Sequence, residues 1–275
     1  MRSSLKVILI QSFLRSIKSY KGDDVLEPCT QRHQYRENLD SETTSGKCDG
    51  YLQANMITLP AEYAFEFLLF CQRNPKPCPV VDVLEAGQVT PRIADADIRT
   101  DLPKYRIYKN GELEREVLDL KDVWQDNFVT FLLGCSFTFE RALVEKGISL
   151  LHQEMNRVVP MYQTTIPCED AGRFNGEMVV SMRAINKEEL DETIRITSKF
   201  PLAHGAPIHV GHPSEIGIEN IENPDYGEFT PFDEEERIPV FWACGVTPQY
   251  VGLNVKPEMM ITHAPGHMLI TDQKE

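Results

Sequence analysis

Hydrophobic and polar positions along the chain alternate between the spacing of a helix and that of a strand. Residues 60–69 carry apolar side chains at helical spacing, begin with a proline in the first turn, and are ended by the RNPKPCP run at 73–79. Residues 128–134 (FVTFLLG) form an unbroken apolar stretch that leads directly into a helical pattern closing at Gly147. A buried strand that runs into a helix is typical of α/β folds, in which ligands commonly bind at that junction.

Shorter patterns predict further elements with a different rhythm. They are a strand at 80–84, a hairpin at 106–116 that turns at Asn110-Gly111, strands at 161–167, 178–184 and 207–210, and a helix at 187–200. The ββαβ order within 161–210 indicates a two-layer α+β module. Strands at 239–244, 259–264 and 267–271 are then expected to return to the first sheet.

Together these elements predict an α/β protein: a three-layer α/β main domain with an inserted two-layer α+β module. The predicted boundaries are 50–150 plus 230–275 for the main domain, 151–229 for the module, 22–49 for a polar linker or extended arm, and 1–21 for a targeting segment. The first 21 residues are basic and rich in serine, with no acidic residue before Asp23. This composition predicts a mitochondrial location, and the alternative is an ordinary N-terminal helix of a cytoplasmic protein.

Charge and cysteine content narrow the classes of partner. The 275 residues include 28 Lys and Arg against 42 Asp and Glu, and the resulting net charge of −14 disfavours nucleic acid. No apolar run approaches the roughly 18 residues that a membrane-spanning helix needs. Seven cysteines without a Cys-x-x-Cys pair indicate free thiols in a reducing compartment. We therefore expect a small-molecule partner, bound through arginines where it is acidic, and the sequence permits a homo-oligomer.

Five of the seven histidines lie in the last third of the chain, each within two residues of Gly or Pro. They are His204, His209, His212, His263 and His267. Pro265-Gly266 interrupts any helix between the last two, and no complete ligand set is present, so we expect no metal. His209 ends a predicted strand and is the leading candidate for a general base.

Other candidate residues lie around the predicted strand ends. Cys168 follows the strand that contains Thr165 and precedes Arg173, so it could be a nucleophile beside a cation, or a buried apolar residue. Ser136 stands where the long apolar strand enters a helix, so the N–H groups there could bind a carboxylate, or Ser136 could be only a helix cap. Arg173 and Arg183 could each pair with a substrate carboxylate or form an ordinary ion pair.

Nine blocks of sequence resemble a known family. They are GYLQANMITLP (50–60), FLLFCQRNPKPCP (67–79), RTDLPKYRIYKNGE (99–112), FLLGCSFTFE (131–140), PMYQTTIPCEDAGRF (160–174), VVSMRAI (179–185), HGAPIHVGHP (204–213), IPVFWACGVTPQ (238–249) and ITHAPGHMLITD (261–272). In this order they resemble the D-glutamate cyclase family, whose bacterial members are provisionally named hydro-lyases. The resemblance implies an α/β protein of two subdomains. For animal relatives it implies a mitochondrial enzyme that interconverts D-glutamate and 5-oxo-D-proline with loss of water.

The resemblance and the candidate residues together predict a hydro-lyase that acts on an acidic amino acid, D-glutamate foremost. The expected roles are a base for His209, with His212 and Cys168 as further catalytic candidates, and substrate contacts for Arg173, Arg183, Ser136, Thr165 and His204. Ring closure requires no cofactor, because the amine and the carboxyl group belong to one molecule. The chain departs from the family pattern at Gln163, where Arg is common, and at His212, where Asp is usual. The alternatives are a Cys168-dependent amide hydrolase and a non-catalytic binder of small carboxylates.

Overall fold

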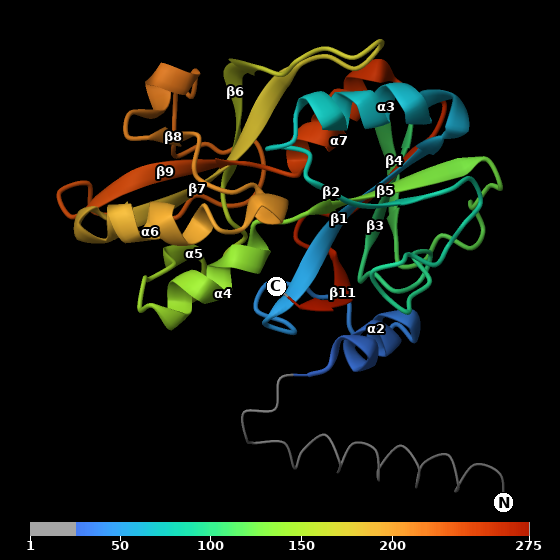
Figure 1. Cartoon of the computed structure of the whole chain (residues 1–275), viewed down its shortest axis with the longest axis horizontal. Coiled ribbons are helices and arrows are strands. Elements are labelled where there is room, and N and C mark those ends of the chain that lie inside the picture. The colour runs from blue at the N-terminus through green and yellow to red at the C-terminus, as the bar shows by residue number, and fades with distance from the viewer. Residues whose placement is uncertain (1–25, 275) are drawn as a thin grey trace, which may run out of the picture.

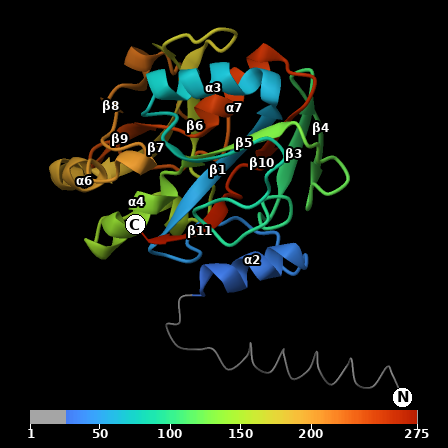
Figure 2. The same cartoon turned by 45° about the vertical axis from the view of Figure 1, so that its right-hand side comes forward.

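Two antiparallel β-sheets with helices packed against them make up the structure (Figures 1 and 2). The computed structural model describes residues 26–274, so the predicted targeting segment at 1–21 lies outside the described residues. The α/β class that the sequence predicts is confirmed, since helices and sheets share each hydrophobic core. The domain boundaries and the three-layer arrangement stay predictions.

The larger sheet is organised around its longest strand, β1. Within residues 26–274 its strands are β1 (Tyr51–Pro60), β2 (Val80–Leu84), β3 (Tyr105–Lys109), β4 (Glu112–Val117), β5 (Phe128–Gly134), β10 (Met260–His263) and β11 (Leu269–Lys274). They run in the order β2-β5-β1-β10-β3-β4, and β11 also pairs with β1. The predicted hairpin is confirmed: Asn110 and Gly111 both have positive φ, at 51° and 84°, as a type I′ turn between β3 and β4 requires.

The smaller sheet has the order β6-β7-β9-β8 in the described chain. Its strands are β6 (Met161–Pro167), β7 (Glu177–Asn186), β8 (His209–Val210) and β9 (Arg237–Ala243). The expectation that 239–244 returns to the first sheet is wrong, because β9 pairs with β7 along its whole length, from Val180 opposite Ala243 to Asn186 opposite Arg237. This pairing buries Phe241 on one face of the smaller sheet and Trp242 on the other. β10 and β11 do pair with strands of the larger sheet.

The helices cover one face of each sheet. They are α3 (Ala61–Arg73), α4 (Phe137–Glu145), α5 (Leu151–Glu154), α6 (Leu190–Thr197) and α7 (Val246–Val255), with 3₁₀ turns at Lys187–Glu189, Pro201–Ala203 and Pro213–Ile216. α3 and α7 lie side by side on the larger sheet, where Phe67 and Val251 pack against Ile57 of β1 (Figure 1). α4 and α6 lie on the smaller sheet, where Phe139 packs against Trp242. The irregular chain between β2 and β3 covers the second face of the larger sheet.

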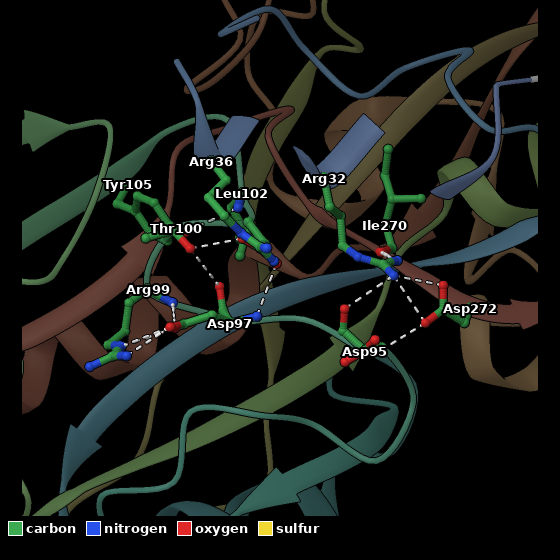
Figure 3. Close-up of polar contacts among 11 residues, drawn as sticks. Arg32, Arg36, Asp95, Asp97, Arg99, Thr100, Leu102, Tyr105, Ile270 and Asp272 are labelled. Carbon is green, nitrogen blue, oxygen red and sulfur yellow. Dashed lines mark hydrogen bonds and ion pairs between the residues drawn. The ribbon is translucent and has the colours of Figure 1, made fainter. Parts of the chain in front are cut away.

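The polar segment 22–49 contains a helix, so its prediction as a linker or extended arm is wrong for residues 28–36. Helix α2 (Pro28–Arg36) lies against β11, and its arginines reach into the fold (Figure 3). The buried Arg32 donates from Nη1 to the carbonyl of Ile270 at 2.8 Å and pairs through Nη2 with Asp272 at 2.8 Å. Arg36 pairs in the same way with the fully buried Asp101, through Nε at 2.8 Å. The arginines, whose charge suggests a solvent-exposed linker, are the side chains that anchor this segment to the rest of the fold.

Replacement of Arg32 should therefore loosen the N-terminal helix. Arg32→Gln removes the ion pair with Asp272 and leaves the buried Ile270 carbonyl without its donor, so the free energy of unfolding should fall by about 2–3 kcal/mol. Urea unfolding followed by circular dichroism measures this change. Arg195→Gln, which removes an exposed pair with Glu192, is the control and should change it by less than about 0.5 kcal/mol. Equal effects of the two variants would show that Arg32 does not anchor α2.

Candidate active site

Two junctions between a strand and a helix have the same local structure and lie at the boundary between the sheets. β5 passes through Cys135-Ser136 into α4, and β9 passes through Cys244-Gly245 into α7. In each junction the cysteine carbonyl accepts a hydrogen bond from the N–H three residues later, at 3.1 Å and 2.9 Å respectively. Burial raises the pKa of the Cys135 thiol to about 12 and that of Cys244 to about 11, so both stay protonated at neutral pH. The start of each helix presents the positive end of its dipole.

Glycines at the two junctions leave room for close neighbours. A Cβ on Gly245 would lie 2.3 Å from Nδ2 of Asn55, and a Cβ on Gly134 would lie 1.5 Å from the carbonyl oxygen of Leu202. Asn55, on β1, donates from Nδ2 to the Gly134 carbonyl at 2.8 Å. The Asn55 side chain therefore packs against both junctions and fixes one relative to the other.

A buried ion pair crosses from the smaller sheet to α4. Arg183 projects from the face of β7 that packs on α4, and its guanidinium binds Glu140, with Nε 3.0 Å from Oε1 and a second bond from Nη2. Nη2 also donates to Ser136 Oγ at 3.1 Å, and Nη1 donates to Ser181 Oγ at 3.1 Å. The two charged side chains are only 1% and 3% exposed. The rings of Phe139 and Trp242 add cation–π contacts at 5.1 and 5.5 Å.

Glu140 also holds the short helix α5. Its Oε2 accepts a hydrogen bond from Nε2 of Gln153 at 2.6 Å, and Nε2 of His152 lies 3.2 Å from Oε1. Burial would raise the pKa of this carboxyl group, but the electrostatic attraction and hydrogen bonds of Arg183 and His152 together outweigh burial and bring the pKa to about 2. The carboxylate is therefore ionised at neutral pH and connects β7, α4 and α5.

Two adjoining cavities open at the first turn of α4. Their volumes are about 240 and 360 Å³, and they share Gly46, Phe137 and Gln153 as lining residues. The smaller cavity is lined by Gln53, Asp49, Glu140, Arg141 and Glu145 among others, and the larger by Thr43, Arg157 and Gly266 among others. Phe137, the residue after Ser136, lines both cavities, whereas Ser136 is buried and lines neither. Each polar space has room for a small metabolite.

The loop from His263 to His267 forms part of the same region. Nδ1 of His263 lies 3.1 Å from the backbone nitrogen of Met56 and 3.3 Å from its carbonyl oxygen, and burial lowers the pKa of His263 to about 4. His267 lies with Nδ1 2.7 Å from the Pro265 carbonyl and Nε2 3.2 Å from that of Ser41. These contacts join the loop to the segment that borders the larger cavity. Within residues 26–274 no group of three or more His, Cys, Asp and Glu residues is arranged to hold a metal ion.

Of the residues predicted from sequence, Ser136, Arg183 and His204 lie near one another. His204 is buried and donates from Nδ1 to the Lys76 carbonyl at 2.7 Å. Burial lowers the pKa of His204 to about 4, and the positive charge of Arg183 acts in the same direction. Arg183 is already paired with Glu140, so it orients Ser136 rather than standing free for a substrate carboxylate.

The remaining predicted residues lie elsewhere. His209, on the edge strand β8, donates from Nε2 to the carbonyl of His212 at 2.9 Å, and in the described chain neither residue lines either cavity. Arg173 pairs with Glu66 and stacks on Tyr63 of α3. Thr165 is exposed beside Gly217. Cys168 is buried in the core under α3, and burial raises its pKa to about 11, which disfavours a thiolate nucleophile. Their roles stay predictions.

Sequence reasoning missed Glu140, Gln53 and Asn55. Glu140 stands one helical turn after Ser136, the spacing that places both on one face of a helix, and this was the available signal. Gln53 and Asn55 interrupt an otherwise apolar strand on alternate positions, so a period of two places them on one face.

The ion pair yields a prediction about stability. Glu140→Gln leaves the Arg183 charge buried without its partner and should lower the free energy of unfolding by about 3–5 kcal/mol. The double variant Glu140→Gln/Arg183→Met removes that charge and should lose much less than the sum of the single variants. Urea titrations of the three proteins measure the coupling, with Glu192→Gln as an exposed control expected to cost less than about 1 kcal/mol. Additive effects would contradict a direct interaction.

The buried histidines yield a prediction about pH. His204 and His263 have folded pKa values of about 4, against 6.5 ordinarily, so the unfolded chain binds protons more readily between these values. Their contribution to stability is complete above pH 6.5 and is lost as the pH falls toward 4. The melting temperature should therefore drop across this window, and less steeply in His263→Gln. The exposed His33→Gln is the matched control and should keep the wild-type slope.

Comparison with known proteins gives consistent matches. The family model for D-glutamate cyclase matches residues 129–272. A relative from Oceanobacillus iheyensis is 68% identical to this chain over 91% of this chain and 99% of its own length. A relative from Geobacillus kaustophilus is 56% identical over 89% of this chain and 93% of its own length. A relative from Bacillus subtilis is 53% identical over 91% of this chain and 98% of its own length. All three relatives are provisionally named hydro-lyases. The solved structure of a nitrogen repressor-like protein from Methanococcus jannaschii matches 89% of this chain and 94% of its own. The sequence identity is 10% and the TM-score is 0.40.

These relatives correct one prediction and establish the family. They come from bacteria, which have no mitochondria, so the mitochondrial location expected from residues 1–21 is wrong and the cytoplasmic alternative fits. None of the helices in the described residues is long and apolar enough to cross a membrane. Because the family model spans more than half of the chain and close relatives match it almost from end to end, the protein belongs to the D-glutamate cyclase family.

Proposed function

We propose that the protein is a hydro-lyase that interconverts D-glutamate with 5-oxo-D-proline and water. Membership of the family and the provisional naming of its close relatives as hydro-lyases support the reaction class. The observation that carries the assignment to a site is the polar cavity at the start of α4, which the buried Arg183–Glu140 pair holds in place.

The chemistry defines what the site must do. The amine nitrogen of the substrate attacks the carbon of the side-chain carboxyl group, a C–N bond forms, and a C–O bond of that group breaks. The ammonium group loses two protons in the course of the reaction, the departing oxygen gains both, and water leaves with no change in net charge. Catalysis therefore requires a folded-back substrate, donors for the oxygen that becomes negative, and a proton acceptor near the amine.

The start of α4 supplies the donors. The N–H of Thr138 is bound to the Cys135 carbonyl, but the positive end of the helix dipole favours negative charge on an oxygen placed there. Ser136 Oγ already accepts a hydrogen bond from Arg183, so its hydroxyl hydrogen is directed to another acceptor, and we assign that acceptor to the substrate carboxyl oxygen. Arg183 is then a positioning residue for Ser136.

The proton acceptor has two candidates. His209 stays the base predicted from sequence, although it lies on the edge strand β8 and lines neither cavity. Asp49 is an exposed carboxylate that lines the smaller cavity, and its position favours it as the acceptor. His209→Asn and Asp49→Asn distinguish them, because loss of a general base lowers turnover by about two to four orders of magnitude.

Turnover tests the proposal directly. The purified protein is incubated with D-glutamate or with 5-oxo-D-proline, and both compounds are followed by chiral liquid chromatography and mass spectrometry, with heat-inactivated protein correcting for spontaneous cyclisation. Ser136→Ala should lower kcat about 100-fold or more, the usual cost of losing one oxyanion donor. The exposed Ser198→Ala is the matched control and should keep wild-type turnover.

Four results would contradict parts of this proposal. No turnover of either compound by the wild-type protein would reject the substrate, and binding without turnover would favour the non-catalytic binder. Wild-type kcat in Ser136→Ala would reject the α4 site. Loss of turnover on alkylation of Cys168 alone would restore the amide hydrolase alternative, which the buried, protonated thiol disfavours.

A further inference from the structure

Gln53 holds a buried amide with one end unpaired. Its Nε2 donates to the carbonyls of Thr44 at 2.9 Å and Lys47 at 3.2 Å. Since both neighbours are acceptors, the orientation of the amide is settled: the NH₂ group faces the 44–47 segment and the oxygen faces away. The residue is 4% exposed, and its Oε1 has no hydrogen-bond partner among residues 26–274. A buried acceptor without a donor is unfavourable and calls for a partner from outside the chain.

The residue that carries the unpaired oxygen lines the smaller cavity, which also borders α4. Gln53 lines this cavity of about 240 Å³, and its backbone N–H lies 3.4 Å from Oγ1 of Thr138 in the first turn of that helix. A small ligand in this space would contact both α4 and Gln53. The groups around the cavity favour opposite partners, because the helix start favours negative charge and Oε1 needs a hydrogen-bond donor.

The charges around the cavity favour a cationic donor. Among its lining residues, Glu140 is neutralised by Arg183, and Glu145 is paired with Arg141 at 2.6 Å. Asp49 remains as a carboxylate for which no pair is seen in the described chain. The lining thus has a surplus negative charge, at Asp49, in addition to the residue with the unpaired acceptor, and this combination suits an ammonium group.

We propose that Gln53 Oε1 accepts a hydrogen bond from the ammonium group of an α-amino acid and distinguishes it from a dicarboxylate without nitrogen. This inference rests on the proposed function and adds a specificity-determining residue to it. The lactam N–H of a cyclised product is also a donor, so the same oxygen serves substrate and product. A site built to pair a ligand N–H rejects the analogue that lacks it, because the buried oxygen then stays unpaired.

Calorimetric titration with matched ligands tests this role. D-glutamate and 5-oxo-D-proline carry the donor, and glutarate, with the same two carboxylates, does not. Gln53→Met should weaken binding of the two nitrogen-containing ligands at least tenfold and that of glutarate less than twofold. The exposed Gln72→Met is the control and should match wild type for all three ligands.

A second variant separates recognition from folding. Gln53→Lys keeps a nitrogen donor toward the carbonyls of Thr44 and Lys47 but removes the acceptor, so it should discriminate against D-glutamate as Gln53→Met does while glutarate still binds. Equal weakening of D-glutamate and glutarate in both variants, or unchanged binding of D-glutamate, would overturn the inference.

Failure of the proposed function has a different signature. The titration is extended to the other free D- and L-amino acids. If D-glutamate is not turned over but any amino acid binds in a manner that Gln53→Lys abolishes, the substrate is wrong and the role of Gln53 stands. If no amino acid binds to the wild-type protein, the inference is overturned.

Discussion

The ionised carboxylate of Glu140 inside the protein is the constraint on which the site depends. A buried charge is tolerated only with a partner and a full set of hydrogen bonds, and Glu140 obtains these from Arg183 on β7 and Gln153 on α5. Because α4 follows directly from β5 of the larger sheet, the same contact sets the smaller sheet against the larger one. The position of the α4 start, and with it the orientation of Ser136, follows from this contact.

The groups around the cavity beside this pair are complementary. The positive end of the α4 dipole favours a carboxylate, Gln53 carries an unpaired acceptor, and Asp49 adds a negative charge. An amino acid presents the matching groups, a carboxylate and an ammonium, at a short separation. The surrounding thiols and His263 stay uncharged at neutral pH because they are buried, so they do not disturb this polarity.

Features that depend on neighbouring residues could be predicted from the sequence, and features that depend on distant partners could not. The apolar strand at 128–134 and the Asn110-Gly111 turn are local signals, and both are present in the structure. Helix α2 was missed because its arginines are paired with Asp272 and Asp101, far away along the chain. The partner of β9 was missed because its apolar pattern suits either sheet.

The same distinction holds at the site. Ser136 could be selected from its place at a strand–helix junction, and Arg183 from its charge in an apolar strand, but their contact joins segments 47 residues apart. Glu140 looks like a surface residue of an amphipathic helix, and only the fold shows it to be buried. The histidine-rich last third suggested His209 by residue type, which carries no information about the cavity that a side chain lines.

A crystal structure of the protein with bound 5-oxo-D-proline would test the central claim most directly. The account predicts the ligand in the cavity at the start of α4, with its carboxylate or ring carbonyl oxygen within hydrogen-bond distance of Ser136 and its lactam N–H directed to Oε1 of Gln53. A ligand bound beside β8 against His209, with the α4 cavity empty, would contradict it.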